Sequence, residues 1–138
     1  MQLFHSFNEI NWLAVAIITV FSFVLGAFWH SSVLFKKTWI KDSGTIYNAS
    51  NHGNPLVIFG LSGLLHLIAI TALAALIGSS AGAVDGLITG LMLSVVWVST
   101  SMAVTYIFVG RTFKLFLIDA GFYVVFYSLA GFVLGAWQ

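Results

Sequence analysis

The side chains that could do chemistry in this sequence are three ionisable groups inside otherwise apolar stretches. His66 lies near the middle of one stretch. Asp119 lies about six residues into another, roughly 9 Å from its end at the rise of an α-helix. His30 lies near the end of a third stretch, at a depth similar to that of Asp119. Ionisable groups inside a membrane are costly and commonly mark a proton or solute pathway, so these three are our candidates.

Each candidate has a catalytic or transport interpretation and a structural one. His30 and Asp119 could meet if the helices that carry them are neighbours. His30 could equally be an interfacial histidine beside Trp29, and His66 a packing histidine. Asp119 could hydrogen-bond across helices, or it could pair with Arg111 or Lys114, whose long side chains can extend along apolar surface. The sequence leaves these alternatives open.

Further polar side chains extend the candidates into stripes along two helices. Tyr123 and Tyr127 follow Asp119 at intervals of four, so these three residues share one helical face. A bundle that buried such stripes would have a hydrogen-bonded polar interior on one half. On the preceding apolar stretch, a second polar stripe is predicted from Ser94, Ser101 and Thr105.

The composition places all of these residues in a membrane protein. Of the 138 residues, 60% are hydrophobic and 7% are charged, whereas a soluble domain is about 25% charged. Five basic and four acidic side chains could not cover the surface of a soluble globule of this size. A soluble enzyme, a nucleic-acid-binding protein and a disordered segment are therefore excluded, and the lipid bilayer is the expected partner.

Four apolar segments are long enough to cross a bilayer, whose hydrocarbon core of about 30 Å needs roughly 20 helical residues. They run over about residues 11–35, 55–77, 86–108 and 113–136. Residues 36–54 are expected to form a polar loop between the first two segments. We therefore predict an all-α fold in which residues 1–138 form a single four-helix transmembrane bundle.

The basic residues predict the orientation of this bundle. The positive-inside rule makes the basic side cytoplasmic and places both termini outside the cytoplasm. Three lysines on the first loop surround Trp39, an arrangement that suits contact with anionic lipid head groups; they are Lys36, Lys37 and Lys41. All five basic side chains fall on that one side, the other two being Arg111 and Lys114.

Glycines recur at intervals of four, as they do in helices whose backbones approach closely in lipid. Gly82, Gly86 and Gly90 enter the third segment. Gly131 and Gly135 lie in the fourth. Packing within the bundle is the simpler interpretation. Self-association is also expected, because four short helices bury few side chains against one another.

No residue pattern indicates a cofactor or a metal site. The chain has no cysteine, no HExxH motif, no phosphate-binding loop and no pairing of a nucleophile with a base. His30 and His66 differ in depth by roughly 10 Å, which fits a pair of axial haem ligands poorly. We expect no cofactor.

Several short motifs follow one another along nearly the whole chain. They are Asn11-Trp-Leu-Ala-Val15, Leu25-Gly-Ala-Phe-Trp29, Leu34-Phe35, Trp39, Gly110-Arg-Thr-Phe-Lys-Leu-Phe-Leu-Ile118, Ala120-Gly121 and Leu134-Gly-Ala-Trp137. As an ordered set they resemble DUF1761, a domain-of-unknown-function family of small bacterial membrane proteins. The resemblance implies four membrane helices, a place in the bacterial inner membrane and no established activity. His30 and Asp119 depart from the pattern, in which tyrosine and an uncharged polar residue are usual at these positions.

Three classes of function follow from these observations. The first is a small homo-oligomeric transporter or channel for a proton, an ion or a small solute, supported by the polar residues inside the spans. The second is a structural or accessory subunit that packs against another membrane protein through its glycine faces. The third is a membrane enzyme, for which the sequence offers only scattered histidines.

Overall fold

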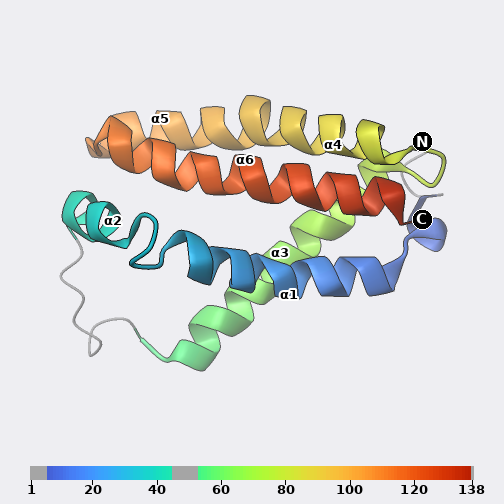
Figure 1. Ribbon diagram of the computed structural model, residues 1–138, viewed down its shortest axis with the longest axis horizontal. Helices are drawn as coiled ribbons and strands as arrows, with labels where there is room; N and C mark the ends of the chain where they lie inside the picture. The colour runs from blue at the N-terminus through green and yellow to red at the C-terminus, as the bar shows by residue number, and fades with distance from the viewer. Residues whose placement is uncertain (1–5, 45–52, 138) are drawn as a thin grey trace.

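The computed structural model describes residues 6–44 and 53–137, and its regular structure there is entirely helical. Four helical rods are long and apolar enough to cross a membrane, as an all-α integral membrane protein requires. Expressed in the labels of Figure 1, the four rods are α1 (Trp12–Trp29), α3 (Pro55–Ile77), the continuous rod from α4 (Ala83–Met92) to α5 (Thr100–Val109), and α6 (Phe113–Ala136).

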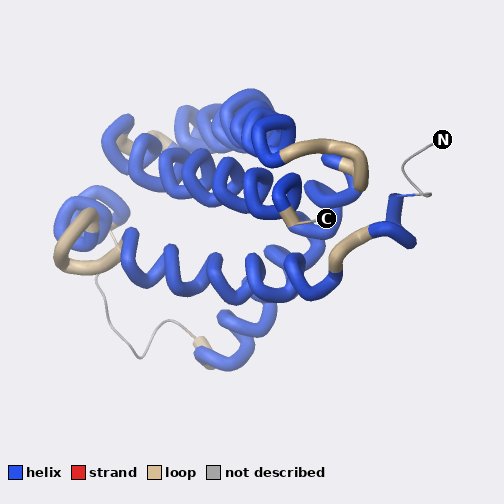
Figure 2. Tube along the Cα trace, turned by 45° about the vertical axis from the view of Figure 1, so that its right-hand side comes forward, coloured by secondary structure: helices blue, strands red, loops and turns tan. Residues whose placement is uncertain are grey.

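Helix α6 is the central rod, and it contacts every other span. It lies alongside α1 on one side and the α4–α5 rod on the other, while α3 crosses the bundle obliquely (Figures 1 and 2). Both termini lie at one end, together with the turn between α3 and α4 (Figure 1). The turn between α5 and α6 lies at the opposite end, which carries the basic residues.

Local signals set the ends of these helices. Asn11 caps α1, because its side chain accepts a hydrogen bond from the Ala14 amide at 3.0 Å. Thr112 caps α6 in the same way through the Leu115 amide. Pro55 opens α3 at a position where its missing N–H costs nothing. Gly110 ends α5 with a φ of 70°, a left-handed conformation that glycine adopts without steric cost.

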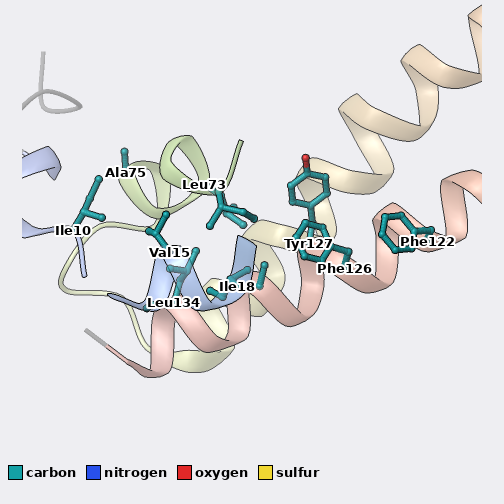
Figure 3. Close-up of a cluster of buried hydrophobic side chains, with 12 residues drawn as sticks. Ile10, Val15, Ile18, Leu73, Ala75, Phe122, Phe126, Tyr127 and Leu134 are labelled. Atoms are coloured by element: carbon teal, nitrogen blue, oxygen red, sulfur yellow. The ribbon is translucent and has the colours of Figure 1, made fainter. Parts of the chain in front are cut away.

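The apolar core lies in the half of the bundle nearer the termini. Val15 on α1, Ile70 and Leu73 on α3, and Phe126 on α6 are fully buried there. Figure 3 shows this cluster, which continues through Leu134 toward the C-terminal end. The opposite half of the bundle has no comparable core among the described residues, because α3 diverges from α6 toward its N-terminal end (Figure 1).

The glycines bring the backbones of α4 and α6 into direct contact. A Cβ added to Gly86 would lie 2.9 Å from the carbonyl carbon of Gly131, and one added to Gly135 would lie 3.0 Å from that of Gly82. A Cβ on Gly90 would meet the Tyr127 carbonyl carbon at 2.8 Å. Real side chains do not fit at such distances, so both glycine faces are used within the chain.

The first expected segment, residues 11–35, is wrong at its C-terminal end. Helix α1 ends at Trp29, and the chain turns before a further helix, α2 (Lys36–Ser43). The polar loop expected over residues 36–54 therefore begins as a helix, and residues 45–52 of it lie outside the described part. The turn is held by backbone hydrogen bonds, including one from the Phe35 amide to the Trp29 carbonyl at 3.3 Å.

The third expected segment, residues 86–108, begins earlier in the structure and is less regular than a continuous α-helix. The rod begins at Ala83, and residues Leu93–Ser99 between α4 and α5 form a π-helical stretch. The Ser99 hydroxyl donates to the Ser94 carbonyl five residues back, at 2.8 Å. The wider turns change which side chains share a face beyond this stretch, since each extra residue rotates the following face by about 100°.

The close contact of α4 with α6 predicts a stability difference between two glycine substitutions. Gly86→Ala should lower the free energy of unfolding by about 1–3 kcal/mol, because the new methyl group overlaps the Gly131 backbone. Gly60→Ala is the matched control, since a Cβ there meets nothing within 4 Å. Unfolding in mild detergent, followed by circular dichroism, measures both. Equal stability of the two variants would contradict the packing.

Candidate functional site

The Asp119 carboxylate is held by donors from two other helices. Its Oδ1 accepts a hydrogen bond from the Trp39 indole N–H on α2 at 3.0 Å. Its Oδ2 accepts one from the Tyr106 hydroxyl on α5. The side chain remains only 19% exposed. A carboxylate inside a span therefore has its charge balanced by hydrogen bonds to its acceptor oxygens, as buried anions require.

His30 lies beside this carboxylate, because α1 and α6 are neighbours, a condition that the sequence left open. Its Nδ1 is 3.0 Å from the Gly26 carbonyl oxygen, which can only accept, so Nδ1 carries the hydrogen. Its Nε2 faces Asp119 Oδ1 at 3.8 Å. His30 lies just beyond the C-terminal end of α1, and the nearby carboxylate raises the pKa of its imidazole above the usual value. Protonation would give Nε2 an N–H directed at that carboxylate.

Besides the contact of Trp39, two hydrogen bonds hold α2 against the turn between α5 and α6. The Thr112 hydroxyl donates to the Asp42 carboxylate at 2.9 Å. The Arg111 guanidinium donates to the Ser43 carbonyl oxygen. Asp119 has no ion pair with Arg111 or Lys114, the alternative that the sequence left open. Among the described residues, the group that can form an ion pair with it is His30, when its imidazole is protonated.

A groove lies between α1, α2, α3 and α6 on the basic half of the bundle. Its volume is about 500 Å³. It forms where α3 diverges from α6 (Figure 1), and α2 contributes three residues to its wall. The groove is lined by Ser22, Phe23, Gly26, Ala27, His30, Lys36, Trp39, Ile40, Ile58, Phe59, Ser62, His66 and Phe122.

His66 is the polar side chain deepest along α3 in this groove. Its Nδ1 donates to the Ser62 carbonyl at 2.8 Å, so the neutral ring leaves Nε2 as an acceptor. The ring lies between Phe23, at a centroid distance of 6.2 Å, and Phe126, at 5.5 Å. Its Nε2 is buried and has no hydrogen-bond partner among the described residues. Such an atom is costly unless a water or a ligand satisfies it.

The structure separates the other polar candidates instead of gathering them. Tyr127 is buried in the apolar core (Figure 3), and Tyr123 is half-buried and stacks on it at 6.1 Å. Ser101 and Thr105 are exposed on the outside of the bundle, where the Thr105 hydroxyl donates to the Ser101 carbonyl. They therefore do not continue the buried position of Ser94, and the predicted second stripe is wrong.

The three lysines of α2 differ in their surroundings although all are exposed. Lys36 lines the groove. Lys37 and Lys41 are not among the residues that line it. The lysines thus supply one cation to the groove and two to the surface at the basic end, where contact with lipid head groups stays a prediction.

Two residues of this arrangement were missed from the sequence, Trp39 and Tyr106 as donors to Asp119. A signal for Tyr106 was present, because a tight turn at Gly110 brings the end of α5 beside the start of α6. The sequence holds no such signal for Trp39, because its approach to Asp119 depends on the turn that follows Trp29. The Trp29 indole itself donates to the Ile118 carbonyl at 3.0 Å, beside Asp119.

Comparisons with known proteins give one match. The profile of a family described as "Protein of unknown function (DUF1761)" matches residues 13–135, almost the whole chain. Neither curated proteins nor solved structures gave a match.

The contact between Trp39 and Asp119 predicts how firmly α2 is held. Trp39→Phe keeps an aromatic ring but removes the donor, so the amides of α2 should exchange about tenfold faster, as expected for loss of one hydrogen bond to a charged group. Hydrogen exchange followed by mass spectrometry in nanodiscs measures this. Trp12→Phe, at the opposite end of the bundle, is the control. Unchanged exchange in α2 would show that the contact does not hold the helix.

Proposed function

Given that the chain belongs to the DUF1761 family, whose function is unknown, we propose that this integral membrane protein is a small carrier for a solute. Its solute enters the groove between α1, α2, α3 and α6. The main support for the proposal is this groove, because it brings Lys36 of α2, His66 of α3 and His30 at the end of α1 to one space of about 500 Å³. Spaces of this size commonly hold small molecules.

The packing of the bundle favours a carrier over an open channel. The groove occupies the basic half, whereas the half nearer the termini is filled by the core around Val15, Ile70 and Phe126. A solute in the groove would therefore meet a closed barrier. A carrier has such a one-sided cavity in each of its states, and passage requires the other half to open.

The placement of the polar residues also favours the groove over a relay along the helices. Tyr127 is packed in the core, while Ser101 and Thr105 face outward. Asp119 uses both oxygens to hold Trp39 and Tyr106. We assign Asp119 to holding the basic end together, and His66 to the solute.

The orientation of the carrier follows from its basic residues. By the positive-inside rule the end with α2 is cytoplasmic, so the groove opens toward the cytoplasm and both termini lie outside it. We place the protein in a bacterial inner membrane. Lys37 and Lys41 are then free to contact anionic head groups of the inner leaflet.

The second candidate is an accessory role, and one observation favours it. Ser101 and Thr105 present small polar side chains at an interval of four on the outside of α5. Helices in lipid associate through such faces. A second copy of the chain or another membrane protein could bind there, and it would co-purify in fixed proportion in mild detergent. This contact is compatible with a carrier that works as a homo-oligomer.

The carrier proposal predicts which positions water can reach. The chain has no cysteine, so single cysteines can be introduced without background. Ser62→Cys, in the groove, should react with a membrane-impermeant methanethiosulfonate added from the basic side. Ala130→Cys, in the packed half and only 2% exposed, should react more slowly and only from the opposite side, when that half opens. Oriented vesicles and mass spectrometry measure both rates.

Two results would contradict the proposal. If Ser62→Cys fails to react from either side while the folded protein is in the membrane, the groove is filled by lipid or by a partner. If Ser62→Cys reacts but Ala130→Cys never does, the groove is a dead end and the protein is not a carrier.

A further inference from the structure

The chemistry of the groove narrows the class of solute. Phe23, Ile58, Phe59 and Phe122 make most of its wall apolar. Lys36 places an ammonium group at the end of the groove nearer the basic side. No acidic residue is among the described residues that line it. An apolar body with one anionic group fits this surface, whereas a cationic solute would find no carboxylate to pair with among the described lining residues.

The buried Nε2 of His66 adds a second requirement. Because Nδ1 donates to the Ser62 carbonyl, Nε2 of the neutral ring can only accept a hydrogen bond. It has no donor among the described residues. Lys36 cannot be that donor without leaving the basic end, because Ser62 and His66 lie two and three helical turns into α3. The deep end of the groove therefore calls for a solute or a water that donates a hydrogen bond, as an O–H does.

One kind of molecule meets both requirements, because its anionic form can pair with Lys36 and its neutral form can donate to His66 Nε2. We propose that the groove takes a weak organic acid with an apolar body, such as a medium-chain carboxylic acid. Its carboxylate pairs with the Lys36 ammonium at the basic end. After taking up a proton from water there, the neutral acid moves deeper and donates its O–H to His66 Nε2. The proton returns to water when the acid leaves.

This inference rests on the proposed function, because it names the solute of the same groove. The contacts of Asp119 also mean that its carboxylate should not repel an anionic solute in the groove. Both carboxylate oxygens accept hydrogen bonds, and His30 lies between Asp119 and the groove with its Nε2 3.8 Å from Oδ1. Phe23 and Phe126 around His66 keep the deep end apolar, which favours the neutral form of an acid over its anion there.

Binding of matched eight-carbon probes tests the inference. The full chain in nanodiscs of zwitterionic lipid is titrated with octanoate, octanesulfonate and octylamine, and empty nanodiscs correct for partitioning into lipid. Octanoate should bind about tenfold more tightly than octanesulfonate, which has the same charge but does not take up a proton. Octylamine should not compete with octanoate. Equal affinity for octanoate and octanesulfonate, or competition by octylamine, would overturn the assignment.

Variants locate the two contacts. Lys36→Gln should weaken the binding of both anions about tenfold. Lys37→Gln, which changes the neighbouring lysine outside the groove, should weaken the binding of neither. His66→Phe keeps a ring between Phe23 and Phe126 and should reduce the affinity for octanoate to that for octanesulfonate. His66→Gln, which retains a polar side chain, serves if the phenylalanine variant does not fold. Equal losses in Lys36→Gln and Lys37→Gln would show mere attraction to the basic surface and contradict a site.

The tests of solute and of carrier fail separately. If the probes do not bind as stated but Ser62→Cys remains reactive from the basic side, the weak-acid assignment is wrong and the carrier stands. If octanoate binds as stated but Ala130→Cys never reacts, the groove binds a weak acid without carrying it.

Discussion

A single carboxylate inside a span sets the arrangement of the basic end. An ionised group there is tolerated only when donors replace the water that it loses. Asp119 obtains them from Trp39 and Tyr106, which come from helices on either side of α6. Because Trp39 belongs to a polar eight-residue helix, its hydrogen bond to Asp119 holds α2 against α6. His30 lies beside the same oxygen and completes the arrangement.

The position of α2 and the glycine contact of α4 with α6 together produce a bundle with two unlike halves. Where Gly86 and Gly131 let two backbones meet, the helices pack closely and the core is buried. Where α3 diverges, α2 supplies the missing wall through Lys36, Trp39 and Ile40, and a groove remains. The groove thus depends on the carboxylate that fixes α2, although that carboxylate is occupied by other contacts.

Much of this architecture could be predicted from local patterns, and the failures have physical causes. Helices α3 and α6 follow from apolar length and their capping residues. Helical rise gives His30 and Asp119 a similar depth, but their contact depends on α1 lying beside α6, which the sequence left open. Helix α2 could not be foreseen, because a mostly polar segment of eight residues forms a helix here only through tertiary contacts. Ser101 was placed on the wrong face since the π-helical stretch breaks the regular period: Ser94 is buried, whereas Ser101 is exposed.

The Asp119 carboxylate stabilises the fold through its contact with Trp39. A double-mutant cycle measures this contribution, with Asp119→Ala, Trp39→Phe and the double variant unfolded under the same conditions in mild detergent. We expect a coupling free energy of about 1.5–3 kcal/mol, as for a hydrogen bond to a charged group, so that the second substitution costs little once the first is made. Strictly additive effects of the two substitutions would contradict it.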